Sequence, residues 1–286
     1  MKKSAFCIAF ILSAMVTAGP LTEEKKLDKI PSLKWRTAVA SVAPGTMKSP
    51  QGKATIKCTY PIIYDETGKP KGTTWPRCNV PLSPDMRDWS RYDYLEFSVY
   101  TTFNRSDEEY LPLTLGIGGE KTKTLNSYDI KTLAQNQWVK VSLPLRQMKR
   151  GEKVRSMQFH LNARRYFHND KLELTIGDFK LVRLLQWQVA AFRMTAPAIF
   201  SDRTTLPVEY ELLGPGEKSK VPFRIYTANG KKLRDITLES ARGFAFHLLP
   251  VGKLAPGKYL LAVFPDAKEK RHEASFEVVA APAWNK

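Results

Sequence analysis

Short stretches in which apolar and polar residues alternate recur along the chain and predict an all-β protein. Residues 89–100, 137–145 and 171–183 each alternate with a period of two, which leaves one face apolar and the other free to meet solvent. Further stretches of this kind lie between Pro and Gly breaks, at 35–42, 54–60, 111–117 and 156–161. Regularly spaced strands with hardly any helical pattern are typical of a sandwich or barrel. We therefore predict a first β-sandwich domain over residues 33–185.

A second series of strands follows and predicts another β-sandwich domain over residues 186–286. The alternation continues at 192–199, 206–213, 221–227, 260–264 and 274–279. Asn229-Gly230 lies between two such stretches and predicts a tight hairpin in which both turn residues have positive φ. The segment from Leu254 through Pro256 and Gly257 to Tyr259 resembles the tyrosine corner of immunoglobulin-like sandwiches, in which the tyrosine hydroxyl bonds to nearby backbone.

The first residues have the pattern of a secretory signal peptide over residues 1–18. Lys2 and Lys3 precede an apolar run at 5–16, and Val16-Thr17-Ala18 supplies small residues before Gly19. The apolar run is too short to span a bilayer. We expect a mature chain without a transmembrane segment, secreted, periplasmic or held at the cell surface. The charged residues 19–32 are interpreted as a leader or a fragment of helix.

Cleavage of the signal would remove Cys7 and leave Cys58 and Cys78. Two cysteines in an exported chain favour a disulfide, because the compartment is oxidising. The bond would close a turn-rich loop and contribute about 3 kcal/mol in the chain-entropy model. Two free buried thiols are the alternative. No CxxC or His-x-x-His spacing accompanies them, which argues against zinc.

The chain is strongly basic, with a formal net charge of +17. The charges are scattered, and a denser stretch contains Arg146, Lys149, Arg150, Lys153, Arg155, Arg164 and Arg165. They form either a solvated surface facing an anionic cell envelope or a site for an acidic polysaccharide. The first interpretation is favoured, because charge alone indicates association and not specificity. An exported sandwich is not expected to bind nucleic acid.

Three segments of the first domain carry a family resemblance. They are Trp89-Ser-Arg-Tyr-Asp-Tyr-Leu-Glu-Phe-Ser-Val-Tyr100, Gln137-Trp-Val-Lys-Val-Ser-Leu-Pro-Leu145 and Leu174-Thr-Ile-Gly-Asp-Phe-Lys-Leu-Val182. In this order they resemble the carbohydrate-binding modules of the galactose-binding-like jelly-roll type, over residues 33–184. The resemblance implies a jelly roll that binds sugars through aromatic platforms and polar groups. Many such modules hold a structural calcium, although no acidic cluster here indicates a calcium loop. No other cofactor is expected, and the metal content stays unknown.

Two loops carry the candidate ligand-binding residues. Trp75 lies in the 58–78 loop with Tyr64 nearby, and an aromatic ring on a constrained loop can stack on a sugar ring with little entropy lost. The alternative is that Trp75 only caps the sandwich. The second loop combines guanidinium, imidazole and aromatic groups suited to sugar hydroxyls or an anionic substituent, and its candidates are Arg164, Arg165, Tyr166 and His168. Its alternative, an ordinary solvated hairpin, is somewhat favoured.

The remaining distinctive residues are assigned structural roles. Trp89, Trp138 and Trp35 begin strands where such folds bury an aromatic side chain, so we expect them in the core. Asp178 follows Gly177 in the closing strand and is expected to bond to a neighbouring loop. His160 and His247 lie in apolar strand segments and are interpreted as core histidines.

Three hypotheses about function follow. The first is a non-catalytic carbohydrate-binding protein that recognises a polysaccharide or cell-envelope glycan. The second is a structural or adhesive envelope protein that makes protein contacts. The third is an enzyme, such as a lyase or hydrolase on a β-sandwich. It ranks last, because a chain of this size with a binding module and a spacer domain has no obvious room for a catalytic domain. The chain also has no GxSxG, HExxH, P-loop or GxGxxG motif, and Glu108-Glu109 or Asp85 and Asp88 are weak candidates for a catalytic pair.

Overall fold

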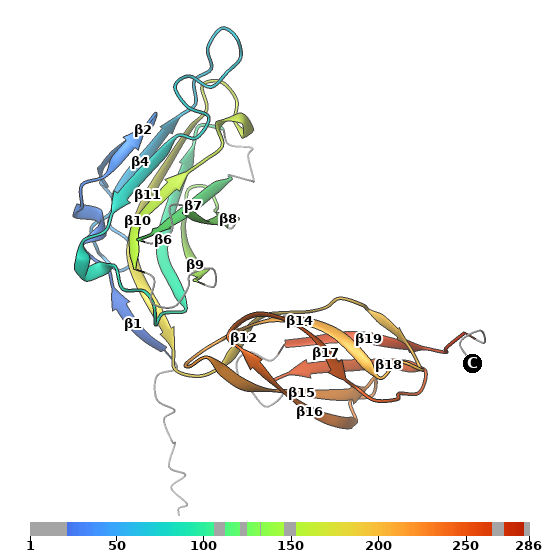
Figure 1. Cartoon of the computed structure of the whole chain (residues 1–286). Helices are drawn as coiled ribbons and strands as arrows, with labels where there is room; N and C mark the ends of the chain where they lie inside the picture. Colours follow the sequence, from blue (N-terminus) through green and yellow to red (C-terminus); the bar gives the residue numbers. More distant parts are fainter. Residues whose placement is uncertain are drawn as a thin grey trace, which may run out of the picture.

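Strands dominate the structure, as the alternating pattern predicts. The computed structural model describes residues 22–105, 112–120, 125–131, 133–145, 153–264 and 272–282. Figure 1 shows two β-sandwiches joined end to end at a steep angle. The all-β fold class is confirmed. The predicted signal peptide lies outside the described residues.

The first sandwich consists of two facing sheets. One contains β1 (Thr22–Lys26), β3 (Ser41–Pro44), β4 (Ile56–Pro61), β6 (Tyr94–Phe103), β9 (Trp138–Pro144) and β11 (Lys171–Leu184), in the order β3-β4-β11-β6-β9 with β1 paired to β11. The other contains β2 (Arg36–Ala38), β5 (Arg77–Pro81), β7 (Leu113–Gly119), β8 (Leu125–Ile130) and β10 (Val154–His160), in the order β2-β5-β10-β7-β8. Three 3-10 turns, Ile30–Ser32, Pro84–Met86 and Ala163–Arg165, connect them.

The core of the first sandwich fills the space between these sheets. Met157 and Phe159 of β10 and Leu172, Leu174 and Ile176 of β11 are buried at every second position, which is why these stretches alternate. Trp89 is buried and donates its indole N–H to the Met86 carbonyl at 2.7 Å, so its predicted core position is confirmed. Trp35 is half-buried and stacks on Phe159. Trp138 is also only half-buried, because it packs on Tyr100 on the outer face of its sheet.

Two predicted segments near the N-terminus differ from the structure. The charged residues Thr22–Lys26, interpreted as part of a leader, form strand β1 against the end of β11. The segment contains no apolar residue and none of its side chains is buried, so the pattern of apolar positions could not indicate this edge strand. The single strand predicted at 35–42 is split at Val39, which has a φ of 50°, so that β2 joins one sheet and β3 the other.

Asp178 lies at a β-bulge in β11 and ties a loop to the sheet. It has a φ of 55° and accepts hydrogen bonds from the hydroxyls of Ser49 and Ser98, the latter at 3.0 Å. The preceding Gly177 has no room for a side chain, because an added Cβ would lie 2.9 Å from Thr55 Cγ2. The predicted bond from Asp178 to a neighbouring loop is confirmed.

Cys58 and Cys78 form no disulfide, which corrects the sequence-based prediction. Both thiols are free and buried, one on each facing sheet. A hydrogen bond to Cys78, followed by burial, raises the pKa of the Cys58 thiol, and the same hydrogen bond lowers the pKa of Cys78. The prediction assumed a loop that needs a covalent closure. Instead, strands β4 and β5 begin and end this segment, and backbone hydrogen bonds hold the turn between them.

The second sandwich has a three-stranded and a five-stranded sheet around its own core. The first contains β12 (Gln188–Met194), β14 (Thr205–Leu213) and β17 (Gly243–Pro250), in the order β12-β14-β17. The second contains β13 (Ala198–Phe200), β15 (Lys218–Thr227), β16 (Lys232–Ala241), β18 (Gly257–Val263) and β19 (His272–Val279), in the order β13-β19-β18-β15-β16. The predicted strand at 192–199 is divided between β12 and β13.

The two turn signals of the second sandwich have different outcomes. Tyr259 donates its hydroxyl to the Ala255 carbonyl at 2.8 Å, which confirms the tyrosine-corner contact. The predicted hairpin exists as β15–β16, but only Gly230 has a positive φ, 81°, and the register shifts beside the turn. The turn is therefore a bulged one, in which Gly230 alone supplies the left-handed residue.

Candidate functional site

The candidate site lies at the end of the first sandwich that is farthest from the second. Figure 1 shows the β4–β5 connection and the loop after β10 side by side at this end. Backbone hydrogen bonds join the two loops: Ala163 N donates to the Thr74 carbonyl at 2.9 Å, and Asn169 N donates to the Ile62 carbonyl at 2.8 Å. The two loops that were singled out in the sequence thus form one surface.

Trp75 is the exposed aromatic side chain at the centre of this surface. Its side chain retains 47% of its exposure, and its ring meets the ring of His160 edge-on with centroids 5.8 Å apart. The backbone N–H of Trp75 donates to the Thr73 hydroxyl at 3.1 Å, which helps to fix the backbone. An indole held in one place with a free face can bind the apolar face of another ring at a small entropic cost.

A hollow of about 120 Å³ lies beside Trp75. Its polar lining comes from three different segments and includes Asp129 of β8, Asn162 and Arg165. Asp129 accepts a hydrogen bond from the Thr114 hydroxyl at 3.0 Å, and the Asn162 side chain accepts one from the Arg164 N–H at 3.1 Å. The hollow therefore presents a carboxylate, an amide and a guanidinium next to an indole.

Strand register extends this polar lining across the outer face of the five-stranded sheet. Arg77 of β5, His160 of β10, Thr114 of β7 and Asp129 of β8 are successive partners in one row. Burial, and in smaller part the charge of Arg77, lowers the pKa of His160, so its imidazole is neutral near pH 7. The row offers hydrogen-bond donors and acceptors in a line that passes beside Trp75, which contacts His160 and shares its hollow with Thr114 and Asp129.

His160 itself was misjudged from the sequence. It is half-buried on the outer face of the sheet and not in the core, with its Nδ1 3.4 Å from the Gln158 side-chain nitrogen. His247 instead stacks on Tyr210 with centroids 5.3 Å apart, next to the core of the second sandwich.

Of the predicted ligand-binding residues, the structure places Trp75 and Arg165 at the same hollow. Arg164 is exposed on the same loop. Tyr64 and His168 link the two loops: the Tyr64 hydroxyl lies 2.8 Å from the Ala163 carbonyl, and the Tyr64 N–H donates to His168 Nδ1 at 2.9 Å. These two residues therefore hold the two loops together.

Tyr166 does not offer its ring to a ligand, which corrects its assignment. The side chain is 5% exposed, packs edge-on against Phe103, and donates its hydroxyl to the Pro112 carbonyl at 3.0 Å. The exposed aromatic of this loop is the next residue, Phe167, which is 68% exposed. The sequence offered no signal to separate them, because Tyr166 and Phe167 are adjacent and only the short turn before them decides which points inward.

Phe167 is held by a charged neighbour. The guanidinium of Arg105 lies 4.7 Å from the Phe167 ring centroid and pairs with both carboxylate oxygens of Asp170, at 2.9 and 3.0 Å. The Phe167 N–H donates to Asp170 at 2.7 Å. The loop is thus rigid at the point where it presents its aromatic ring.

The acidic residues considered for catalysis behave as turn residues. Asp85 and Asp88 accept hydrogen bonds from Ser83 and Ser90, and these bonds lower the pKa of each carboxyl. Glu108-Glu109 lie outside the described residues, as do Arg146, Lys149 and Arg150 of the basic stretch. Within the described ranges, no three His, Cys, Asp or Glu side chains are grouped as a metal site would require.

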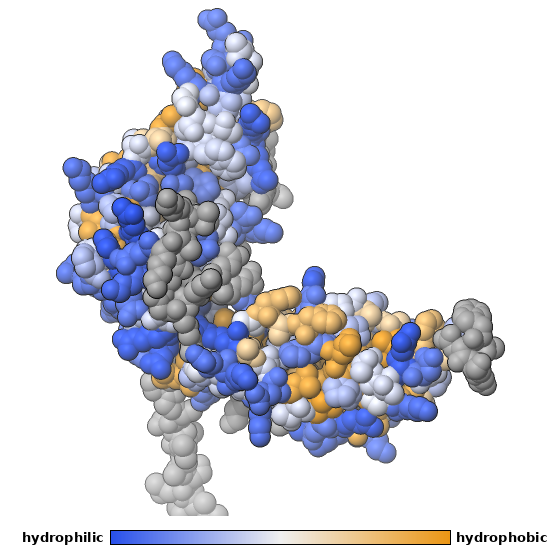
Figure 2. All heavy atoms as spheres, viewed as in Figure 1, coloured by the Kyte–Doolittle hydropathy of each residue, from blue (hydrophilic) through white to orange (hydrophobic). Residues whose placement is uncertain are grey.

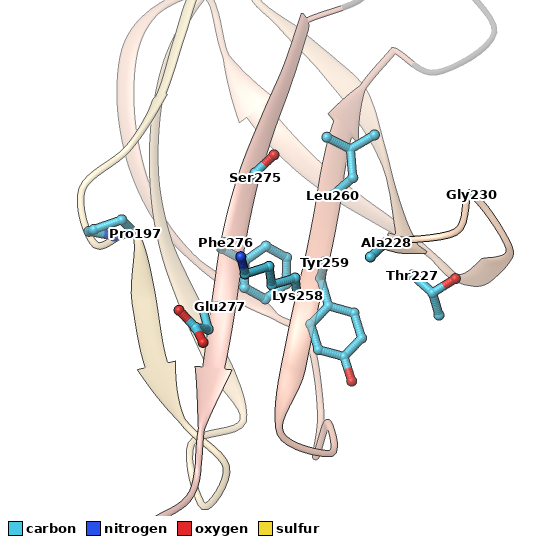
Figure 3. Close-up of a pocket in the computed structure, with 10 residues that line it drawn as sticks. All are labelled: Pro197, Thr227, Ala228, Gly230, Lys258, Tyr259, Leu260, Ser275, Phe276 and Glu277. Carbon is cyan, nitrogen blue, oxygen red and sulfur yellow. The ribbon is translucent and has the colours of Figure 1, made fainter.

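A second, larger hollow of about 460 Å³ lies on the second sandwich (Figure 3). Its lining includes Tyr259 and Phe276, whose rings stack with centroids 5.5 Å apart, and Lys258 and Glu277 on the outer face. The Tyr259 hydroxyl is already bonded to backbone, so this hollow surrounds the tyrosine corner. None of the predicted ligand-binding residues lines it.

No family model and no curated protein matches the chain. Carbohydrate-binding modules are among the similar solved structures. A family 11 module from Clostridium thermocellum, in complex with a β-1,3-1,4-mixed-linked tetrasaccharide, is 16% identical with a TM-score of 0.39, over 57% of this chain and 97% of the module. A module specific for non-crystalline cellulose is 14% identical with a TM-score of 0.33, over 51% of this chain and 86% of the module.

Enzymes are also among the similar structures. A β-1,2-glucanase from Parabacteroides distasonis is 10% identical with a TM-score of 0.38, over 92% of this chain but only 37% of the enzyme. The chain therefore spans about a third of that enzyme's length. Likeness at these identities and TM-scores assigns neither a family nor a ligand to this chain.

Among the helices of the described residues, none is both long and apolar enough to cross a membrane.

Proposed function

We propose that the chain is an exported, non-catalytic protein that binds a polysaccharide or cell-envelope glycan at the distal end of its first sandwich. One observation carries the proposal: an exposed Trp75, fixed against His160, stands at a hollow whose polar lining continues as a row of side chains across the sheet. An aromatic face beside convergent hydrogen-bonding groups suits a sugar ring, which has an apolar face and a polar rim.

The binding surface is open and largely preformed. Trp75 comes from the β4–β5 loop, Asp129 from β8 and Arg165 from the loop after β10, and backbone hydrogen bonds fix both loops to each other. A preformed surface loses little conformational entropy on binding. Arg77, Arg164 and Arg165 add positive charge near this end, which supports an acidic glycan as the preferred ligand over a neutral one.

The experiment is a glycan array of residues 19–286 with neutral, uronic and sulfated polysaccharides, repeated with Trp75→Ala. The matched control is Trp138→Ala, because Trp138 is a half-buried indole on the outer face of the opposite sheet. The proposal expects binding to one glycan class that Trp75→Ala abolishes and Trp138→Ala retains. An affinity that falls as the salt concentration rises would identify the ligand as acidic. No binding to any glycan would contradict the proposal.

One observation favours a second candidate function, an adhesive protein that makes protein contacts. Strand β17 carries a row of exposed apolar side chains, and glycan binding at the first sandwich gives them no role.

A further inference from the structure

Strand β17 presents an unusual apolar stripe at the edge of the three-stranded sheet. Phe244, Phe246 and Leu248 are 61%, 55% and 59% exposed and alternate along the strand, so all three lie on the outer face. Figure 2 shows hydrophobic residues gathered on this side of the second sandwich. The intervening residues Ala245 and Leu249 pack toward the core. The three side chains of the stripe are therefore not part of the core that stabilises this domain.

The strand is also open along one side. β17 pairs with β14 from Thr205↔Pro250 to Leu212↔Gly243, and it is the last strand of its sheet within the described residues. Its second edge offers backbone N–H and C=O groups to another strand. Such an edge is a template for pairing with a second chain, and proteins normally protect it with short length, charges or bulges.

β17 has no charged side chain and its only proline, Pro250, is its last residue, whereas the other edges are charged or short. Over its eight residues it contains no Lys, Arg, Asp or Glu, in a chain of which 26% is charged. Among the other edge strands that the structure describes, β1, β8, β9, β12 and β16 carry charged side chains, and β2, β3 and β13 have three or four residues. The exposed, charge-free length of β17 is thus specific to this one edge.

We propose that β17 pairs antiparallel with β17 of a second copy of this chain. The stripe is self-complementary about Phe246: a two-fold axis through that residue places Phe244 opposite Leu248 of the partner and Phe246 opposite itself. In a chain of net charge +17, two copies repel at most surfaces, and this strand lets them meet without opposing like charges. The two three-stranded sheets would then join into one continuous sheet.

Charges on the neighbouring strand fit the same arrangement. β16 is joined to β17 by Arg242 alone and lies at the edge of the facing sheet on the same side. Its charged side chains already pair within the chain: Lys232 lies 2.5 Å from Asp235, and Lys218 of β15 lies 3.3 Å from Glu239. The two-fold axis sets the β16 strands of the two copies antiparallel, and these internal pairs keep like charges from opposing the contact.

The area of the stripe predicts a weak dimer. A fully buried aromatic side chain removes roughly 150–250 Å² from water, so six side chains about 60% exposed could bury at most on the order of 600 Å². The outer face of the joined sheet stays open to solvent, so lateral contacts between the stripe side chains bury only part of this area. Specific stable interfaces bury about 1,200–2,000 Å². Backbone pairing adds to the apolar area, and the dimer should form in the micromolar range or above.

The test is sedimentation velocity of residues 19–286 from low micromolar to submillimolar concentration. Phe246→Lys would oppose two ammonium groups at the two-fold axis and is expected to weaken the dimer about tenfold or more. The control is Phe200→Lys, since Phe200 is a 40% exposed aromatic on the short edge strand β13. This control should dimerise as the unchanged chain does, and circular dichroism should show both variants folded.

A cross-linking experiment identifies the contact without weakening it. Phe246→Cys places one thiol from each copy at the axis, and a short bis-maleimide should link them, whereas Phe200→Cys should give no cross-linked dimer. A chain that remains monomeric at every concentration overturns the proposal. A dimer that survives Phe246→Lys overturns it too, because the contact then lies elsewhere. So does a monomer that binds lipid vesicles through Phe246, because the stripe would then be a membrane contact.

Discussion

Arg242 of the second sandwich and Asp93 of the first form an ion pair that is almost closed to solvent. The Asp93 side chain is 1% exposed, and the Arg242 guanidinium also donates to the Tyr92 carbonyl at 3.1 Å. Asp93 accepts a further hydrogen bond from the Leu184 N–H at 2.8 Å, at the last residue of β11. The ion pair thus links one side chain from each sandwich close to Leu184, where the chain leaves the first sandwich.

We expect Arg242→Ala to lower the free energy of unfolding by about 3–5 kcal/mol, because it leaves the buried Asp93 carboxylate without its cation. The measurement is chemical denaturation followed by tryptophan fluorescence. Arg91→Ala is the control, since Arg91 is exposed beside the same turn and its removal should change stability by less than about 0.5 kcal/mol. Equal losses in both variants would contradict a role for the pair.

Asp178 gives a second stability prediction. Asp178→Ala removes the acceptor for the Ser49 and Ser98 hydroxyls and places alanine at a φ of 55°, so we expect a loss of about 2–4 kcal/mol. Asp178→Asn should lose less, because asparagine accepts one of these bonds and tolerates the left-handed conformation. Thermal unfolding of the two variants compares them, and equal losses would argue against the hydrogen bonds.

The contribution of the tyrosine corner to the free energy of unfolding can be measured by removing the Tyr259 hydroxyl. Tyr259→Phe should cost about 1–1.5 kcal/mol, because the hydrogen bond to the Ala255 carbonyl is lost while the stacking on Phe276 stays. Tyr100→Phe is the matched control, since no hydrogen bond of the Tyr100 hydroxyl is found within the described part of the chain. If Tyr259→Phe leaves the free energy of unfolding unchanged, the corner contributes only packing.

The lowered pKa of His160 predicts the direction in which the stability of the fold changes with pH. Its pKa is lowered from 6.5, first by burial, so the unfolded chain binds this proton more readily than the folded one. The stability that neutral His160 contributes is present above pH 6.5 and is lost as the pH falls toward its lowered pKa. We expect His160→Gln to show a smaller loss of stability over that window than the unchanged chain. Identical pH profiles would contradict the assignment.

The sequence predicts the class of fold because strand alternation is a local property. The inward faces of β10 and β11, the corner at Tyr259 and the role of Asp178 all follow from residues a few positions apart. Strands β1, β5 and β8 were missed because each is short and carries polar or charged residues on its outward face. Such strands are held by pairing with distant partners, which local pattern does not show.

The candidate site could be predicted only in part, for the same reason. Trp75 and Arg165 were singled out because of their side-chain chemistry. Their meeting at one hollow depends on β5 pairing with β10, whose register the sequence does not indicate. Asp129 and His160 were missed as members of the site because only the pairing of distant strands brings them to the hollow and to Trp75. The buried state of Tyr166 depends likewise on its packing against Phe103.

The most direct test of the central claim is the dissociation constant of the array-selected oligosaccharide, measured by calorimetry for the unchanged chain and for Trp75→Ala. We predict that Trp75→Ala weakens binding about tenfold or more, as expected when a central indole contact is removed, while Trp138→Ala leaves it unchanged. If Trp75→Ala binds as well as the unchanged chain and Trp138→Ala does not, the binding surface is the outer face of the opposite sheet and the account is contradicted.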